Sequence, residues 1–285
     1  MRYAGLKQLG QPQEVVNAAG LYLILFGSSI LPALVTQAGK AYSEALNHPW
    51  EPTLILLGGV TLNIFLNWIF IYGNLGVPAM GLEGAGWATL IARILMSMVL
   101  LAYLSNSKVL RPFHPKAWWA ALHLNCFRQL MTIGIPVAGQ LLLEVGAFAF
   151  AAVMIGWISA DAIAAHQIAI TCAATTFMFP LGIGMAVCIR VGQAWGAGRY
   201  ARMRRTGTVG FVAAGLLMGI FAAMFILAGE CIAGLFIKDP AVIHLAANLL
   251  VIAALFQIAD GFQVVAISAL RGLSDVRIPT FIAIF

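Results

Sequence analysis

The stretch from Gly134 to Ile158 reads GIPVAGQLLLEVGAFAFAAVMIGWI. It is long enough to cross a bilayer as a helix, which requires about 20 apolar residues. One acid, Glu144, lies in its middle. A charged side chain at the centre of a membrane helix costs about 2.5–3.5 kcal/mol, whereas a leucine there returns only about 0.3–0.6 kcal/mol. A carboxylate at this depth therefore requires a partner, a proton or a water-filled cavity.

Stretches of this kind make up most of the chain. Of its 285 residues, 62% are hydrophobic and 9% are charged, against about 25% charged in an ordinary soluble domain. This composition predicts an all-α integral membrane protein with about seven transmembrane helices and the start of an eighth. The net charge of +6 does not indicate nucleic-acid binding, because the basic residues lie between apolar runs and form no patch interleaved with aromatic residues.

Breaks rich in glycine and proline divide the chain into the predicted helices. Residues 47–52, 73–81 and 190–205 are expected to be turns or loops, and Asp161 is expected to cap the helix that follows it. The expected helices cover residues 15–40 with a continuation to 46, then 53–72, 83–104, 134–158, 162–187, 206–228 and 240–270, and an eighth begins at 280.

The basic residues alternate between the two sides of the predicted membrane domain. One set of loops carries most of them, including Lys108, Arg111, Arg128 and the run from Arg190 to Arg205, whereas the opposite set carries only Arg2, Lys7 and Lys238. The positive-inside rule places the basic set in the cytoplasm.

This orientation gives the two deep acids a common level. Glu144 follows the predicted cytoplasmic entry near Gly134, and Asp260 precedes the predicted cytoplasmic exit near Leu270 by the same number of residues. Both then lie roughly 15 Å into the membrane, at 1.5 Å per residue. If they face each other they favour a cation or a proton between them. For Na⁺, the amides of Gln140 and Gln257 offer further hard oxygen atoms.

Four further polar residues of the apolar helices are interpreted individually. Arg93 is interpreted as structural, and Asn63 and Asn67, spaced i,i+4, as donors and acceptors between helices. His166, near the outer end of its helix, is interpreted as a packing histidine rather than a proton relay.

Several ordered motifs across nearly the whole chain resemble the multidrug and toxic-compound extrusion (MATE) family, in its bacterial NorM-like form. The resembling residues are Gly134-Ile135-Pro136 with Glu144, the AAHQIA run at 164–169, the RVGQ run at 190–193 with Gly196 and Gly198, and the QIADGFQV run at 257–264.

The resemblance implies twelve helices in two six-helix lobes around a central cleft. This chain looks like family helix four to the start of helix eleven, and is therefore expected to be a fragment. Residues 1–107 would form a partial N-terminal lobe with helices four to six. Residues 108–130 would be a cytoplasmic linker between the lobes. Residues 131–285 would form a partial C-terminal lobe with helices seven to ten and the start of eleven.

The resemblance also implies a function and a site. The chain would be a Na⁺- or H⁺-coupled efflux antiporter for multiple drugs and organic cations, working by alternating access in the bacterial inner membrane. Glu144 and Asp260 match the family acids that bind the coupling cation, which makes them the candidate Na⁺ ligands. Asn63 and Asn67 match a polar pair of the first lobe. Phe256 stands where relatives often carry tyrosine.

The expected partners are cationic drugs, the lipid bilayer and a complementary missing segment, with no nucleic acid and no cofactor beyond the coupling ion. An integral membrane enzyme is a rival interpretation, but the loops are basic and nearly free of the acids that would hold Mg²⁺. A flippase for lipid precursors would favour basic residues in its central cavity, where Arg93 is the main candidate. A non-transporting, truncated remnant is the third alternative.

Overall fold

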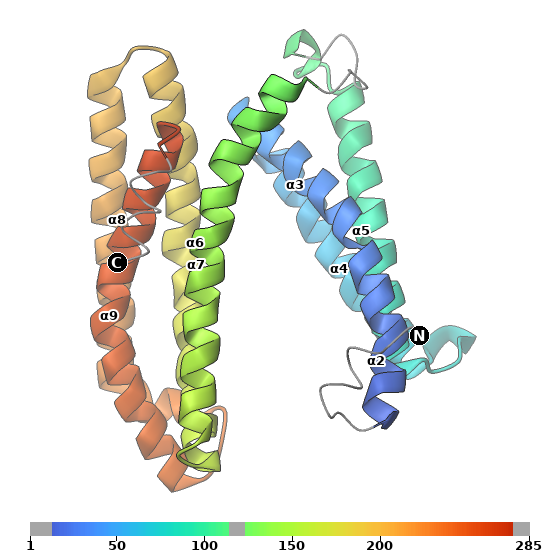
Figure 1. The fold of residues 1–285 in the computed structure, drawn as a ribbon, viewed down its shortest axis with the longest axis vertical. Helices are drawn as coiled ribbons and strands as arrows, with labels where there is room; N and C mark the ends of the chain where they lie inside the picture. The colour runs from blue at the N-terminus through green and yellow to red at the C-terminus, as the bar shows by residue number, and fades with distance from the viewer. Residues whose placement is uncertain (1–12, 114–122, 276–285) are drawn as a thin grey trace. The chain divides into compact units, whose positions relative to one another are not determined.

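The structure is a computed structural model that describes residues 13–113 and 123–275. All regular structure within these ranges is helical, and seven helical spans are long and apolar enough to cross a membrane. The predicted all-α membrane fold is therefore confirmed. The expected start of an eighth helix at 280 lies outside the described residues. The chain divides into two compact units, residues 1–119 and 120–285, which are described separately (Figure 1).

The first unit contains three membrane-length segments, and its central element is the helix that contacts all the others. Helix α5 packs against α2, α3 and α4. The helices are α2 (Gln13–Ser28), α3 (Ile30–Ala45), α4 (Trp50–Tyr72) and α5 (Gly81–Asn106), with short 3₁₀ turns η1 (Asn74–Gly76) and η2 (Arg111–Phe113).

A break at Ser29 separates α2 from α3, where the sequence predicts one continuous helix. Pro32 supplies the physical reason. It has no N–H to donate to the carbonyl group of Ser28, and its ring crowds that carbonyl group. The two helices still form one membrane span, from Gly20 to Ala45.

Arg93 of α5 binds at this break. Its Nη1 donates a hydrogen bond to Ser29 Oγ at 2.7 Å, and its guanidinium group lies over the Phe26 ring, 5.1 Å from the centroid. Ser29 is completely buried. The contacts agree with the structural interpretation of Arg93, because they connect α5 to the end of α2.

Replacing Ser29 by alanine tests this contact. The change removes the acceptor of a charged donor, so we expect the free energy of unfolding to fall by about 1.5–3 kcal/mol. Ser28→Ala is the matched control, since Ser28 Oγ donates to the carbonyl group of Ile24 on its own helix at 2.8 Å and, among the described residues, to no other helix. Its expected loss is below about 0.5 kcal/mol. Reversible unfolding in mixed micelles measures both values, and equal losses would contradict the role of Arg93.

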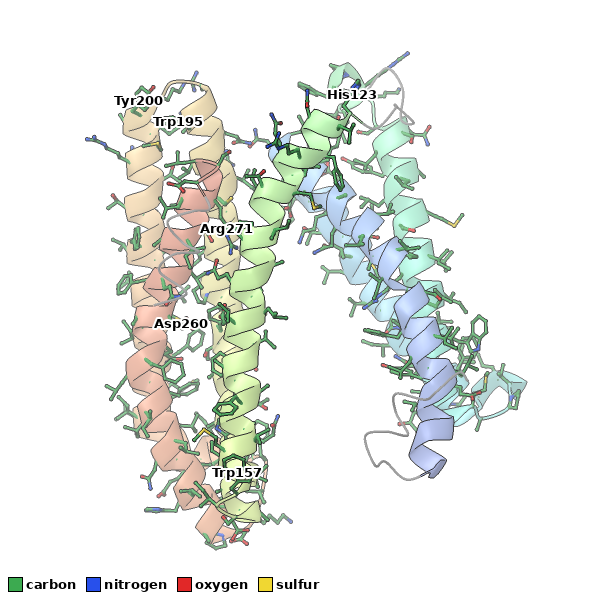
Figure 2. All side chains as sticks on the ribbon, in the orientation of Figure 1. His123, Trp157, Trp195, Tyr200, Asp260 and Arg271 are labelled. Atoms are coloured by element: carbon green, nitrogen blue, oxygen red, sulfur yellow. The ribbon has the colours of Figure 1, made fainter. Side chains whose placement is uncertain are left out.

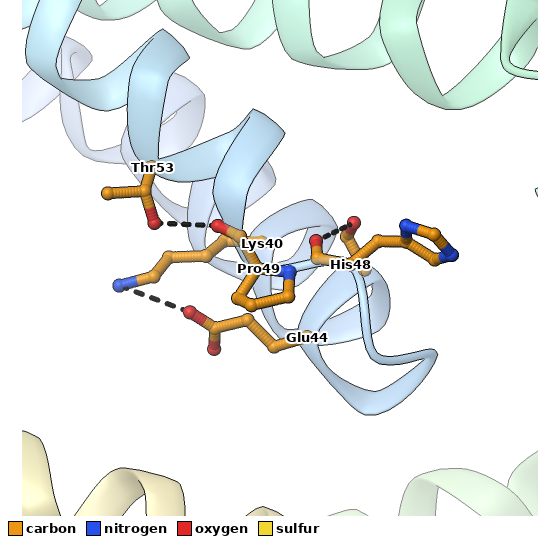
Figure 3. Close-up of polar contacts among 6 residues, drawn as sticks. Lys40, Glu44, His48, Pro49 and Thr53 are labelled. Atoms are coloured by element: carbon orange, nitrogen blue, oxygen red, sulfur yellow. Dashed lines mark hydrogen bonds and ion pairs between the residues drawn. The ribbon is translucent and has the colours of Figure 1, made fainter.

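The turn between α3 and α4 is shorter than the predicted break at 47–52. Helix α4 begins at Trp50, and Pro52 is accommodated in its first turn, where the missing N–H needs no partner. Asn47 has a φ of 66°, a left-handed conformation that asparagine tolerates. Figure 3 shows the nearby contacts: Lys40 Nζ with Glu44 Oε1 at 3.6 Å, Ser43 Oγ to the His48 carbonyl at 2.7 Å, and Thr53 Oγ1 to the Pro49 carbonyl at 2.7 Å.

The second unit consists of four long helices joined by short connections, so that successive helices run in opposite directions (Figure 1). Helices α7, α8 and α9 pack closely on one another, whereas α6 contacts α7 over a smaller surface and buries only Gln140. The helices are α6 (Leu124–Gly156), α7 (Ala160–Gly196), α8 (Tyr200–Gly234) and α9 (Pro240–Gly272).

The ends of these helices correct the sequence-based boundaries. Helix α6 begins at Leu124, inside the predicted linker 108–130, and most of the predicted loop 190–205 is helical because α7 continues to Gly196 and α8 begins at Tyr200. Hydropathy marks the part of a helix in the membrane, but backbone hydrogen bonding continues beyond it. Ser159, not Asp161, caps α7, since its Oγ accepts a hydrogen bond from the N–H of Ala162 at 3.1 Å.

Helices α7 and α9 approach each other closely at two glycines. A Cβ atom added to Gly272 would lie 2.5 Å from the carbonyl oxygen of Cys188, and one added to Gly192 would lie 3.0 Å from the carbonyl oxygen of Gly272. Because the obstructing atoms belong to the backbone, only the smallest residue permits this contact.

Candidate functional site

The structure brings together Glu144 of α6 and Asp260 of α9, because both line the same two cavities within the second unit. Glu144 is exposed and Asp260 is half-buried. Figure 2 shows Asp260 part-way along the unit. Arg271 lies nearer the end marked by Trp195 and Tyr200, and Trp157 lies at the opposite end.

The larger space, here called the aromatic cavity, has a volume of about 480 Å³ between α6, α7 and α9, with Met218 of α8 at its wall. Three phenylalanine side chains line it, one from each of the main helices: Phe148, Phe177 and Phe256. Its polar lining is small and consists of Glu144, Asp260, Gln257 and His166. Aromatic walls with negative groups suit an aromatic cation.

The second space, here called the polar pocket, has a volume of about 420 Å³ between α6 and α9. Both acids line it together with Gln140 and Gln263. The sequence interpretation missed Gln263. Its spacing from Asp260, i,i+3 on a helix, is the signal that could have found it, because such residues share a face.

The two amides predicted as ligands already accept hydrogen bonds through their oxygens. Gln140 Oε1 accepts from Arg271 Nη2 at 3.1 Å, and Gln257 Oε1 accepts from Thr176 Oγ1 at 3.1 Å. Both glutamines are buried, at 5% and 2% exposure. An amide oxygen has a second lone pair, so these groups can still assist a cation, but the net negative charge comes from the two acids.

Asn63 and Asn67 lie on α4 in the first unit and interact with each other. Asn67 Nδ2 donates to Asn63 Oδ1 at 3.1 Å, a contact within one helix rather than the expected contact between helices. Asn67 Oδ1 is buried and has no hydrogen-bond partner among the described residues.

The two acids and the neighbouring amides of the second unit present oxygen atoms, which are ligands for hard cations. Within residues 13–113 and 123–275, no group of three or more His, Cys, Asp or Glu side chains is arranged to hold a metal ion. Two carboxylates with nearby amides can hold Na⁺, a proton or an organic cation. Phe256 lines both cavities with a ring that carries no hydroxyl ligand.

Seven membrane-length helical spans, with a cavity lined by two acids in the second unit, define a multi-pass membrane protein with an internal polar site. The chain belongs to the MatE family, whose sequence profile matches residues 136–285, just over half of it. The family is one of transporters, so the chain is not assigned to an enzyme class.

Individual relatives agree with this assignment. The chain is 37% identical to "Probable multidrug resistance protein NorM" of Mesorhizobium japonicum, over 98% of this chain and 61% of the relative. It is 34% identical to "Multidrug resistance protein PmpM" of Pseudomonas aeruginosa, over 95% of this chain and 57% of the relative.

Solved structures share the fold. A mutant of the Vibrio cholerae MATE transporter VcmN superposes with a TM-score of 0.87 at 19% identity, over 98% of this chain and 62% of the other. The eukaryotic MATE transporter AtDTX14 gives a TM-score of 0.82 at 20% identity, over 97% and 61%. The chain thus spans about three-fifths of the length of the relatives it matches.

Proposed function

We propose that the protein exports organic cations, including drugs, in exchange for Na⁺ or H⁺ across a bacterial inner membrane. The observation that carries this proposal is that Glu144 and Asp260 line a cavity with three phenylalanine rings. The names of the bacterial relatives, which are multidrug resistance proteins, support the substrate class.

The coupling follows from the charges. Two carboxylates that share a pocket repel each other, which favours the uptake of one positive charge from either side of the membrane. A cationic drug and a coupling ion would then compete for the same acids. Exchange results if the ion binds more tightly in one conformation and the drug in the other, since only differential affinity shifts a conformational equilibrium.

The charge of the cavity also separates this proposal from a lipid-precursor flippase. Such a substrate carries phosphate groups, and the described lining residues of the aromatic cavity and the polar pocket include two acids and neither lysine nor arginine. Arg93 is bonded to Ser29 in the first unit. An anionic substrate would therefore meet repulsion from Glu144 and Asp260.

The test measures drug transport in proteoliposomes with imposed ion gradients. The chain is studied alone and within a twelve-helix fusion that supplies the remaining helices of a NorM relative. We expect a Na⁺ or a pH gradient alone to drive uptake of a fluorescent cation by the fusion, and dissipation of both gradients to stop it. Lowering the pH should weaken cation binding, because a protonated carboxyl group carries no charge.

Three other transport results would contradict or change the proposed function. Transport that continues without either gradient would contradict ion coupling. Transport by the fusion and none by the chain alone would support the remnant interpretation for the chain by itself, and transport of an anionic lipid precursor in place of the cation would support the flippase.

A further inference from the structure

His166 is a polar residue of the aromatic cavity that the proposed ion exchange does not use. It lies on α7 and lines the same cavity as Glu144 and Asp260. Its Nε2 atom is buried and has no hydrogen-bond partner among the residues that the structure describes. A buried polar atom without a partner costs about 1–3 kcal/mol, so a rotation of the imidazole that brings Nε2 to a ligand in the cavity would recover that free energy.

His166 and Asp260 lie far apart along the cavity. The hydrogen bond between Thr176 and Gln257 aligns α7 with α9. His166 lies about 15 Å from the level of Thr176 toward the start of α7, and Asp260 lies about 4 Å beyond Gln257 toward the end of α9, at 1.5 Å per residue. The separation along the helices is therefore roughly 20 Å, and the wall of α7 between the two ends consists of alanine, isoleucine and phenylalanine.

This separation argues against a direct proton transfer between the imidazole and Asp260, because one hydrogen bond covers only about 3 Å. A purely packing role is also a poor match, since a buried packing histidine normally has its nitrogen atoms satisfied within the protein. A ligand that spans the cavity can contact His166 at one end and Asp260 at the other.

We propose that His166 forms the second polar end of the drug site and selects elongated aromatic cations that carry a hydrogen-bonding group far from the positive charge. This inference rests on the proposed function, because Asp260 must hold the positive end. The middle of such a molecule would contact Phe148, Phe177 and Phe256. The imidazole can accept or donate through Nε2 according to its tautomer.

Two dyes that differ at one end test the proposal. The first is a bis-benzimidazole with a piperazinium group at one end and a phenol at the other, and the second is its ethyl ether. Their fluorescence on binding to the purified chain in nanodiscs gives both dissociation constants. We expect the wild-type protein to prefer the phenol by about five- to tenfold, the worth of one hydrogen bond.

The variants separate the role of His166 from that of the acids. His166→Leu should reduce the preference to below about twofold, because only the phenol loses its partner. His166→Gln should retain part of it. His244→Leu is the matched control, since His244 is exposed on α9 outside the lining of the cavity, and it should leave the preference unchanged.

The other binding results separate failure of the His166 role from failure of the cation site. An unchanged preference in His166→Leu, or an equal loss of affinity for both dyes, overturns the role of His166 while leaving the proposed function intact. The ether dye tests the function separately. If neither dye binds the wild-type protein, or if Asp260→Asn leaves binding of the ether unchanged, the cation site itself is wrong and the inference fails with it.

Discussion

Asp260→Asn is expected to abolish ion-coupled efflux and to weaken cation binding by about 10- to 100-fold. The change keeps the shape of the side chain and removes its charge, in a cavity where apolar walls leave few other partners for a cation. Hydrogen bonds and contacts to a charged group are worth about 1.5–3 kcal/mol, and each 1.4 kcal/mol is a factor of ten. Glu144→Gln should act in the same direction, because Glu144 lines the same spaces.

The double variant gives a sharper result than either single change. If both carboxylates hold one cation, removal of either one already destroys the site. The double variant Glu144→Gln with Asp260→Asn should therefore lose less cation-binding free energy than the sum of the losses in the two single variants. Two independent sites would give additive losses.

The measurements are dye binding to the purified chain and gradient-driven transport by the twelve-helix fusion. Glu230→Gln is the matched control, because Glu230 is an exposed acid on α8 that lines neither cavity. It should retain binding and transport within about twofold. Efflux at the wild-type rate in both Glu144→Gln and Asp260→Asn would remove the proposed role of the acids.

Gly272→Ala is expected to lower the free energy of unfolding by about 2–3 kcal/mol, which is within the range for overpacked sites. The new Cβ atom would lie 2.5 Å from the carbonyl oxygen of Cys188. A backbone atom cannot rotate away, so α7 and α9 must separate at this point. Arg271, the preceding residue, would move with the helix and loosen its hydrogen bond to Gln140.

Gly219→Ala is the control for this change. Gly219 lies inside α8, and a Cβ atom there would meet nothing within 4 Å. Alanine favours helix over glycine by up to about 1 kcal/mol, so the control should be neutral or stabilising. Thermal and chemical unfolding of both variants in micelles measures the difference. Equal stability of the two variants would contradict the close backbone contact.

The sequence was sufficient for the membrane fold because hydropathy is a local property. Each apolar run must satisfy its own backbone hydrogen bonds in lipid, so it must be a helix wherever it occurs. The predicted ends of the helices were less accurate, as α7 and α8 show. A helix can continue past the membrane surface without any change in its backbone hydrogen bonding, so hydropathy does not mark where it ends. The break at Ser29 was also missed, although Pro32 marks it.

The candidate site was also predictable from the sequence only in part. The depth of Glu144 and Asp260 could be counted along the chain, since the rise per residue of a helix is constant. The direction in which each helix turns its side chains could not be counted, because it depends on packing against neighbouring helices. For this reason the sequence could not show that Gln263 lines the polar pocket or that His166 lines the aromatic cavity.

The sequence by itself therefore determined that the chain is a multi-pass membrane protein, and it predicted which residues lie deep in the membrane and which acids share a level. Only the tertiary structure decided that Glu144 and Asp260 line the same cavities and that the oxygens of Gln140 and Gln257 already accept hydrogen bonds from Arg271 and Thr176. It also decided that Asn63 bonds to Asn67 along one helix. The physical reason is that hydrophobicity and helical rise act along the chain, whereas side-chain contacts depend on how helices rotate and pack against one another.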